Sequence, residues 1–410
     1  MVNPPKPATR AGLCGPMTGV KVLDLGTMFA GPFAAALLGD FGAEVIKVEL
    51  PKTGDPVRNI VVVNGVSGAW SILNRNKRCV SLDVRKEKGK ALLKRLVAWA
   101  DIVVENFRPG TLEGWGLGYP EMKAVNPRLI MIRISGYGQT GPHAYKAGFG
   151  TPATAFSGFT YLTGYPDRPP VSPPFALVDY LTGINGAMAA VMALYYLEKH
   201  QAPEGQEVDI ALYESVFRLL ETIVAEYGMT GKVRERIGHT MLESAPCGAF
   251  ECQDGKWVVI VTSTDRTFTR LAEAMGHPEW MKDPRYNTNP SRVKNREELL
   301  AMTQAWTRQH PAAELLKILD KEGVPVCPIN SMADIFEDPH YQARENLVQV
   351  EHPVLGKMTM PGIVPKFSQT PGAIRSAGPV KIGEHNGEVY RDLLGVKDEE
   401  LRGLEAEGVI

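Results

Sequence analysis

The stretch that decides the fold covers residues 20–49 and reads VKVLDLGTMFAGPFAAALLGDFGAEVIKVE. Its first part, 20–25, is a short apolar run that is typical of a buried strand. Gly31-Pro32 opens a helical pattern over 33–41, because proline is accepted at the first position of a helix. A second apolar run over 45–49 reads as another strand. A strand, a helix and a strand in this order predict a parallel βαβ unit.

The same alternation continues to about residue 150. Residues 145–178 are rich in glycine, proline and threonine and predict a long, ordered, functional loop, after which a helix, a strand and a helix follow to about residue 227. Further strands are predicted at 79–84, 102–105, 129–134 and 206–212, and helices at 86–100, 119–125, 179–199 and 213–227. This pattern indicates an α/β fold with a doubly wound, largely parallel sheet. Such sheets bind ligands beyond the C-terminal ends of their strands.

The next part of the chain has a different pattern. Residues 228–246 suit a linker, and 248–261 form a hairpin candidate with Asp254-Gly255 at its turn. Helices are predicted at 267–275, 295–309 and 312–321, and a strand at 326–329. We therefore expect a small α+β domain over about 230–325.

Composition and length indicate an ordinary soluble, multidomain protein. The chain has 410 residues, 44% of them hydrophobic and 22% charged, with a formal net charge of −1. Two or three domains are expected, and no nucleic-acid or membrane partner is indicated. The five scattered cysteines show no metal-ligand spacing. Residues 1–13 lack the apolar core of a signal peptide, and the apolar run 184–196 is too short for a bilayer. A cytoplasmic location is expected.

Residues 175–183, FALVDYLTG, hold the main candidate for chemistry. They follow a proline-rich loop and precede a long apolar run, so a helix is predicted to start near Asp179. An aspartate there has two interpretations. It is either an N-cap for the helix or a nucleophilic carboxylate that forms a covalent acyl intermediate. This stretch by itself favours the cap.

Three other segments are candidate ligand contacts. The first ends the second strand at Glu49, placed like a ribose-binding acid, but Gly26–Gly31 lacks the G-x-G-x-x-G spacing of a dinucleotide site. That turn either presents its backbone N–H groups to an anion or a thioester, or serves only to pack the helix against the sheet. The second segment, 106–110, has two interpretations: it stacks on an adenine and holds a phosphate, or it is an ordinary turn. The third, the basic cluster 74–78, is a phosphate contact or a solvated loop.

Together these stretches resemble the family III CoA-transferases, which include formyl-CoA transferase, carnitine CoA-transferase and the acyl-CoA racemases. The resemblance runs through almost the whole chain. Its motifs, in order, are GVKVLDL at 19–25, AGP at 30–32, GAEVIKVE at 42–49, GD at 54–55, NKR at 76–78, VENFRPG at 104–110, SGYG at 135–138, Asp179 with Gly183, GVP at 323–325 and GEH at 383–385.

The resemblance implies a large Rossmann-like domain made from both chain ends, with a smaller α+β domain inserted, and two interlocked chains. The domains would be 1–228, 229–325 and 326–410. It makes Asp179 the catalytic residue and places CoA against Met28, Ala30, Leu82, Arg85, Asn106, Phe107 and Lys146. Phe29 and Tyr180 would form the substrate pocket, with Met28 and Trp115 close by.

The implied activity moves CoA from an acyl-CoA donor to a free carboxylic acid through an aspartyl-CoA thioester. The substrates are an acyl-CoA and an acid, with no prosthetic group and no metal. Backbone N–H groups of the Gly26–Gly31 turn are expected to stabilise the oxyanions. A homodimer is expected, with a hetero-oligomer of related subunits as the alternative.

Departures from the family pattern narrow the activity. Phe149 stands where the racemases carry a histidine base, and Phe29 stands where formyl-CoA transferase carries a glutamine. These residues argue against racemization and against oxalate, because an apolar ring leaves a second carboxylate unpaired. We expect a bulkier acceptor, such as a substituted succinate or an aryl-alkanoic acid, with succinyl-CoA or acetyl-CoA as donor. An acyl-CoA racemase or isomerase and a non-catalytic subunit remain the alternatives.

Overall fold

The computed structural model describes residues 15–410, so the segment 1–13 that was searched for a signal peptide lies outside the described residues. By their mutual contacts the residues form two units. The larger contains the described residues up to Phe159, Ser172–Ala225 and Gln342–Ile410, and the smaller contains Thr160–Val171 and Glu226–Tyr341. Compact units need not fold independently, so the domain boundaries expected from the sequence remain a prediction.

A six-stranded parallel sheet forms the centre of the larger unit. Its strands are β1 (Lys21–Asp24), β2 (Glu44–Glu49), β5 (Lys77–Ser81), β6 (Ile102–Glu105), β7 (Ile130–Ser135) and β8 (Glu207–Ala211). Their order is β5-β2-β1-β6-β7-β8, and every pair of neighbours is parallel. This is the doubly wound order, in which the chain leaves β1 toward one edge and returns at β6 toward the other. The α/β class and the parallel sheet predicted from the alternation are confirmed.

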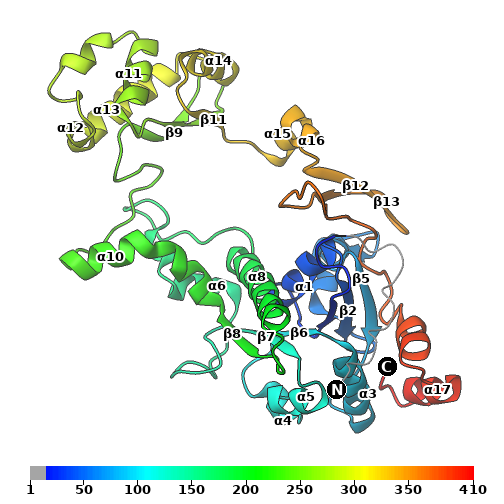
Figure 1. Ribbon diagram of the computed structural model, residues 1–410. Coiled ribbons are helices and arrows are strands. Elements are labelled where there is room, and N and C mark those ends of the chain that lie inside the picture. Colours follow the sequence, from blue (N-terminus) through cyan, green and yellow to red (C-terminus); the bar gives the residue numbers. More distant parts are fainter. Residues whose placement is uncertain (1–14) are drawn as a thin grey trace. The chain divides into compact units, whose positions relative to one another are not determined.

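Helices cover both faces of this sheet (Figure 1). The helices of the larger unit are α1 (Ala30–Asp40), α2 (Gly68–Leu73), α3 (Glu87–Trp99), α4 (Thr111–Gly114), α5 (Tyr119–Val125), α6 (Gly150–Phe156), α8 (Leu177–Lys199), α9 (Leu212–Phe217) and α17 (Asp398–Ala406). Three further helices, α7 (Phe159–Leu162), α10 (Glu221–Thr230) and α16 (Pro339–Ala343), are divided between the two units, and α15 (Met332–Glu337) belongs to the smaller one. On one face α1 and α8 pack side by side against the strands. On the other face α3, α5 and α17 enclose a second apolar core.

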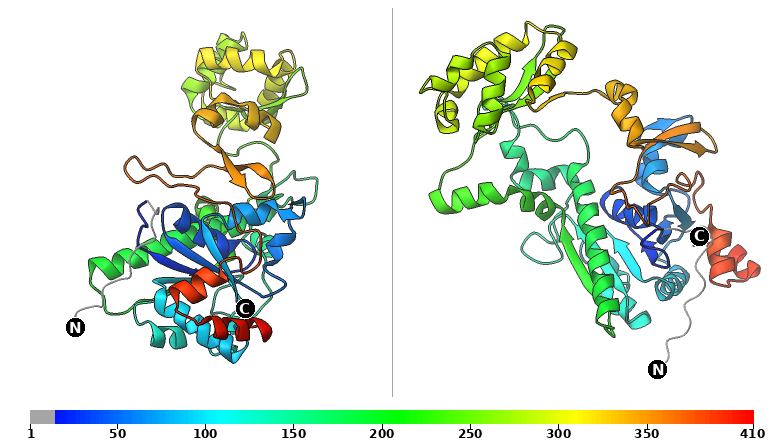
Figure 2. Two further views of the ribbon diagram at one scale, coloured as in Figure 1. Left: turned by 90° about the vertical axis from the view of Figure 1, so that its right-hand side faces the viewer. Right: turned by 45° about the horizontal axis from the view of Figure 1, so that its top comes forward.

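The last residues of the chain complete the edge of the sheet beside β5. The N–H of Cys79 donates to Nδ1 of His385 at 3.1 Å, and the N–H of Ser81 donates to Oδ1 of Asn386 at 3.0 Å. The hydroxyl of Tyr390, in a π-helical turn Gly387–Leu393, donates to the Ser81 carbonyl. Figure 2 shows this C-terminal segment in red beside the sheet. The larger unit is therefore built from both ends of the chain.

The smaller unit holds an antiparallel sheet and its own helices. Strands β9 (Cys247–Glu251), β10 (Trp257–Val261) and β11 (Val326–Pro328) pair in the order β11-β10-β9, so the predicted hairpin with an Asp-Gly turn is confirmed. The helices are α11 (Asp265–Ala274), α12 (Asn289–Lys294), α13 (Arg296–Thr307) and α14 (Ala312–Glu322). Two short pairs, β3–β4 (Val62–Val63 and Val66–Ser67) and β12–β13 (Leu347–His352 and Gly356–Pro361), belong to the larger unit.

Helix α8 differs in two respects from its sequence-based prediction. It begins at Leu177, two residues before Asp179, and its N-cap is Ala176. Asp179 therefore lies in the first turn, and the N-cap interpretation is wrong. At 23 residues the helix is also long and apolar enough to cross a membrane by length and composition, which the shorter run 184–196 did not suggest. Buried core helices pass the same test, and α8 packs Gly183 and Gly186 against α1.

Candidate active site

The turn that joins β1 to α1 lies where the strand order of the sheet reverses. It follows the C-terminal end of β1, and the segment from Asn106 follows the end of the neighbouring β6. Asn106 connects the two, because its Oδ1 accepts the N–H of Thr27 at 2.7 Å and its Nδ2 donates to the carbonyl of Thr27 at 2.8 Å. A parallel sheet binds its ligand at this reversal, so the turn marks the candidate site.

One side of the turn opens on a pocket of about 420 Å³, here called the CoA pocket. It lies over the C-terminal ends of β1, β2 and β5. Its wall is mostly apolar, and Phe107 and Trp115 meet edge to face in it with ring centroids 5.5 Å apart. The lining residues are Leu25, Thr27, Val48, Glu49, Leu50, Thr53, Gly54, Asp55, Pro56, Asn59, Leu82, Val84, Arg85, Leu93, Phe107, Leu112 and Trp115.

Beyond the turn lies a second pocket of about 290 Å³, here called the acyl pocket. Met28 and Phe29 form one wall, the segment 149–154 another, and the segment 172–179 with Asp179 closes it. Thr27 lines the CoA pocket and Met28 the acyl pocket, so the turn separates two neighbouring cavities. A long ligand can thus lie in one cavity and present its reactive end in the other.

Asp179 is a half-buried carboxylate that faces the acyl pocket without an opposite charge. Burial raises its pKa to about 6, and a hydrogen bond with its own backbone N–H opposes this shift. Among the described residues no ion pair includes Asp179. A carboxylate that is not paired with a cation keeps its lone pairs available, as a nucleophile requires.

Gly150 makes room for this carboxylate. A Cβ added to Gly150 would stand 2.0 Å from Oδ2 of Asp179, a distance that no side chain can accept. The first residue of α6 is therefore glycine because the aspartate approaches its backbone. Gly183, one turn after Asp179, has a similar role, since a Cβ there would lie 2.9 Å from the Ala30 carbonyl. Two glycines thus fix how closely α6, α8 and α1 meet around Asp179.

The structure places the residues that the sequence assigned to CoA in different surroundings. Leu82, Arg85 and Phe107 line the CoA pocket, and Met28 lines the acyl pocket. Ala30 is buried at the start of α1. Asn106 is committed to Thr27, and the exposed Lys146 lines neither pocket. These assignments to CoA remain a prediction.

The two residues assigned to the substrate pocket form an aromatic cluster with a neighbour on α1. Phe29 lines the acyl pocket, while Tyr180 lies behind it, 5.9 Å from Phe29 and 4.8 Å from Phe33 between ring centroids. Trp115, expected near Phe29, instead lines the CoA pocket. The sequence also missed Gly150, whose contact with Asp179 depends on residues far apart in the chain.

The basic cluster 74–78 has neither of the roles weighed for it. It is buried and paired inside the protein. Arg75 binds Asp40, Lys77 binds Asp24 at 2.8 Å, and Arg78 binds Glu44. These three cations lie at or just before the start of β5, and each is already paired with a carboxylate. They are therefore unavailable to a phosphate. Glu49 is likewise occupied, because the guanidinium of Arg58 donates to both of its oxygens at 2.8 Å.

Fold and site together define a Rossmann-like enzyme with a half-buried, unpaired carboxylate in a pocket near the reversal point of its sheet. The sequence model described as CoA-transferase family III matches residues 17–386. A Chloroflexus aurantiacus protein named succinyl-CoA--D-citramalate CoA-transferase is 45% identical over 397 residues, covering 96% of this chain and 98% of its own. The succinyl-CoA--L-malate CoA-transferase beta subunit of that organism is 44% identical, covering 96% and 98%.

A solved structure shares the fold as well. The crystal structure of a CAIB/BAIF family protein from Brucella suis has a TM-score of 0.82 and 35% identity, covering 93% of this chain and all of its own. The chain belongs to CoA-transferase family III. It is an enzyme, a CoA-transferase that takes CoA thioesters and carboxylic acids as substrates.

Proposed function

We propose that this protein transfers CoA from succinyl-CoA to a substituted succinate through a thioester on Asp179. The observation that carries the proposal is the position of Asp179, unpaired and half-buried in a pocket next to the CoA pocket. The relatives named for citramalate and malate support this choice of acids, because both are substituted succinates. It also agrees with the expectation of an acceptor bulkier than oxalate.

The first half-reaction moves CoA onto the enzyme. The Asp179 carboxylate attacks the thioester carbon of the donor, the C–S bond breaks, and CoA leaves as a thiolate. The thiolate then attacks the aspartyl carbonyl of the mixed anhydride, and the donor acid departs as a carboxylate. Each step exchanges one activated carbonyl for another, which is how covalent catalysis divides a difficult step.

The second half-reaction returns the aspartate. The acceptor carboxylate attacks the aspartyl thioester, the thiolate leaves, and a second anhydride forms between acceptor and enzyme. The thiolate attacks the acceptor carbonyl, which releases the new acyl-CoA and the Asp179 carboxylate. Both halves develop oxyanions beside the turn that carries Met28 and Phe29. The N–H groups of Gly26, Thr27 and Met28 already donate to side chains, so the expectation that they bind the oxyanions is wrong. The N–H groups from Phe29 to Gly31 are the candidate donors that remain in this turn.

The wall of the acyl pocket favours an acid with some apolar surface. Phe29, Phe149 and Phe175 contribute aromatic area, worth roughly 25 cal/mol per Å² that an acyl chain buries. Thr151 and Ser172 add hydroxyl groups that can hydrogen-bond a second carboxylate. Among the described residues no histidine lines the pocket, which disfavours the racemase alternative, because Asp179 would have no second acid–base group to work with at the α-carbon.

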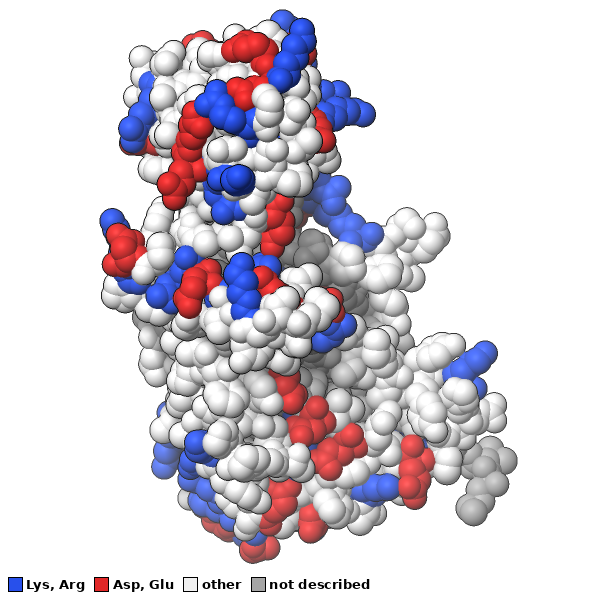
Figure 3. Space-filling view, turned by 90° about the vertical axis from the view of Figure 1, so that its left-hand side faces the viewer, with Lys and Arg blue, Asp and Glu red and all other residues white. Residues whose placement is uncertain are grey.

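We also propose that two copies associate through α8 and α10. On α8 six large apolar residues at helical spacing are exposed: Ile184, Met188, Val191, Met192, Tyr195 and Tyr196. Figure 3 views the molecule from the side where α10 lies in Figure 1 and shows broad areas without charged residues. A row of exposed apolar side chains along one helix favours an interface. A homodimer in the cytoplasm is the assembly we propose, and a hetero-oligomer with a related subunit is the alternative.

An exchange assay tests the proposed activity. Purified protein is incubated with succinyl-CoA or acetyl-CoA and one free acid at a time, and new acyl-CoA is identified by mass spectrometry. Succinyl-CoA with citramalate or malate should give the fastest exchange. A phenyl-substituted acid and oxalate are the competing arms, and a clear preference for oxalate would contradict the proposal.

A further inference from the structure

The turn between β1 and α1 is held by side chains from four separate segments of the larger unit. Every polar backbone group from the Gly26 N–H to the Met28 N–H has a side-chain partner. The Gly26 N–H donates to Asp24 Oδ1 at 3.0 Å, the Gly26 carbonyl accepts from Lys47 Nζ, both polar groups of Thr27 bind Asn106, and the Met28 N–H donates to Asp55 Oδ1 at 3.2 Å. Such complete anchoring is unusual for a surface connection, which commonly binds water instead.

The backbone at Met28 explains why anchoring is needed. Met28 has φ of 60°, in the left-handed region that residues with a Cβ rarely adopt. The strained residue and the next one, Phe29, form the wall of the acyl pocket. Strain of this kind persists only where the surroundings enforce it, and it gathers at functional sites. Whatever holds Met28 therefore also fixes that wall.

Asp55 is the residue that binds Met28 directly. It is 2% exposed, and its Oδ1 accepts the N–H groups of Met28 and Val57. Its Oδ2 lies 3.4 Å from Nζ of the fully buried Lys47 and has no hydrogen-bond partner. Lys47 in turn donates to the Gly26 carbonyl. Asp55 and Lys47 together therefore bind both ends of the turn, Asp55 at Met28 and Lys47 at Gly26.

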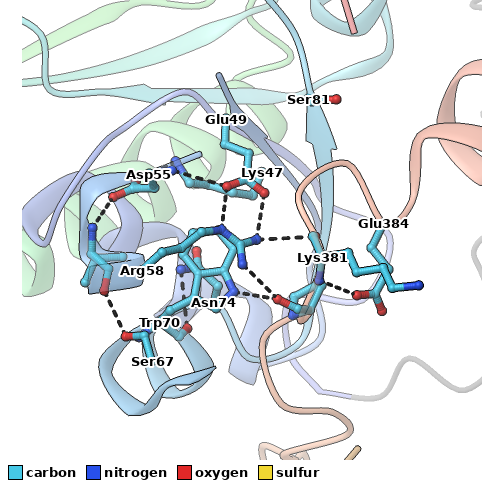
Figure 4. A network of polar contacts seen from close by, with 12 residues as sticks. Lys47, Glu49, Asp55, Arg58, Ser67, Trp70, Asn74, Ser81, Lys381 and Glu384 are labelled. Atoms are coloured by element: carbon cyan, nitrogen blue, oxygen red, sulfur yellow. Dashed lines mark hydrogen bonds and ion pairs between the residues drawn. The ribbon is translucent and has the colours of Figure 1, made fainter. Parts of the chain in front are cut away.

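A rigid support fixes Asp55 in this position. Its own N–H donates to Oε2 of Glu49 at 3.2 Å, and Arg58 holds both oxygens of Glu49. The guanidinium of Arg58 stacks over Trp70, 3.7 Å from the ring centroid, and donates to the carbonyl of Val380. Figure 4 shows these groups gathered at one place. As a cap for the turn Pro56–Asn59, Asp55 would need only its bond to Val57, so the contacts to Met28 and Lys47 require another explanation.

We propose that Asp55 is a positioning residue for CoA transfer at Asp179. Paired with Lys47, it keeps Met28 in the left-handed conformation and so fixes the backbone of the acyl pocket wall opposite the aspartate. This inference rests on the proposed function. Asp55 also borders the CoA pocket, so a role in binding CoA would appear in KM, whereas positioning of the wall would appear in kcat.

The test compares two buried aspartates of the same unit. Asp55→Ala removes the support of the turn. Asp40→Ala is the matched control, because Asp40 is 1% exposed and pairs with Arg75, with no contact to the turn. For each variant the rate of Asp179 modification at saturating succinyl-CoA, kcat and KM are measured on folded protein. Asp55→Asn is the conservative variant, since its amide oxygen still accepts the Met28 N–H but its NH₂ cannot pair with Lys47.

The inference predicts that Asp55→Ala lowers the modification rate and kcat about hundredfold below Asp40→Ala, with KM for succinyl-CoA within threefold, as expected when groups that stabilise a transition state are displaced. Asp55→Asn should recover about tenfold of that loss, because it keeps the bond to the Met28 N–H but loses the charge pair with Lys47. Equal kcat in Asp55→Ala and Asp40→Ala, or an effect on KM alone, would overturn the inference.

If Asp55→Ala does not fold, Asp55→Asn decides the question by itself. A wild-type kcat in Asp55→Asn would overturn the inference, and a kcat about tenfold lower would support it. Absence of any modification in the wild-type protein instead contradicts the proposed function.

Discussion

The backbone of Gly150 lies so close to Asp179 that any side chain at 150 would collide with the carboxylate, 2.0 Å from its Oδ2. One helix start, that of α6, is thereby shaped by a single side chain of another helix, α8. The contact limits the positions that the Asp179 carboxylate can adopt. The other side of the carboxylate faces the acyl pocket, where a substrate can reach it.

Gly150→Ala should therefore impair catalysis more than folding. The new methyl group has to displace the Asp179 carboxylate, and a misplacement of about 1 Å can lower kcat about hundredfold. Gly403→Ala is the control, because Gly403 lies inside α17 with nothing within 4 Å of an added Cβ. That control should keep full activity and gain roughly 0.5–1 kcal/mol of stability. Steady-state kinetics and thermal unfolding of both variants decide between these outcomes.

Asp179→Asn should abolish exchange and leave the protein folded. An amide is too weak a nucleophile to open a thioester, whereas Ala176, not Asp179, caps the helix. The measurement is acyl-CoA exchange alongside circular dichroism. Near-normal turnover in this variant would remove Asp179 from the mechanism.

The same substitution should change the dependence of stability on pH. Burial raises the pKa of Asp179 from 3.8 to about 6, so folding favours its protonated form. The resulting stabilisation is present below pH 4 and is lost as the pH rises through 6. A shift of this size corresponds to at most about 3 kcal/mol. Asp179→Asn should therefore unfold at a higher temperature than the wild type at pH 7.5, with the difference shrinking toward pH 4.5. An unchanged difference would show that the carboxyl group is not desolvated.

The pH dependence of activity should be opposite to that of stability, with activity rising as the pH rises. The carboxylate is the attacking form, so kcat/KM should fall as the pH is lowered through about 6. The profile is measured with succinyl-CoA between pH 5 and 8, with stability of the protein checked at each pH. An activity that is flat down to pH 5 would contradict an attacking group with this pKa.

The exposed face of α8 should be required for assembly. Met188→Glu places a charge in the middle of the apolar stripe, whereas Val354→Glu places one at a similarly exposed residue in the loop between β12 and β13. Sedimentation at low concentration should find a folded dimer for the wild type and Val354→Glu. Met188→Glu should dissociate or unfold, because the proposed interface would bury the new charge without a partner. Dimers in Met188→Glu would argue for another interface.

The hydrophobic pattern of the sequence predicts the strands of the central sheet well, because strands such as β6 and β7 are buried along their whole length. The predicted strand 102–105 and helix 119–125 agree with β6 (Ile102–Glu105) and α5 (Tyr119–Val125). Helix α6 (Gly150–Phe156) was not predicted in a segment rich in glycine, proline and threonine. Local propensity is poor there, and contact with Asp179 and α8 stabilises the helix instead.

The site was only partly predictable for a similar reason. Asp179 and Phe29 could be assigned because their motifs are continuous in the sequence. The support of the turn at Met28 could not, because Asp24, Lys47, Asp55 and Asn106 meet only in the folded sheet. Lysine and arginine are rarely buried, so the sequence predicts a surface or ligand contact for Lys77. In the structure Lys77 pairs with Asp24 in the core instead.

Trapping of the enzyme-bound intermediate tests the central claim most directly. The wild-type protein is mixed with succinyl-CoA without an acceptor, quenched with hydroxylamine, digested and analysed by mass spectrometry. The account predicts a hydroxamate on Asp179, because hydroxylamine cleaves an aspartyl thioester or anhydride, and no such product in Asp179→Asn. An enzyme that exchanges CoA at full rate while Asp179 stays unmodified would contradict it.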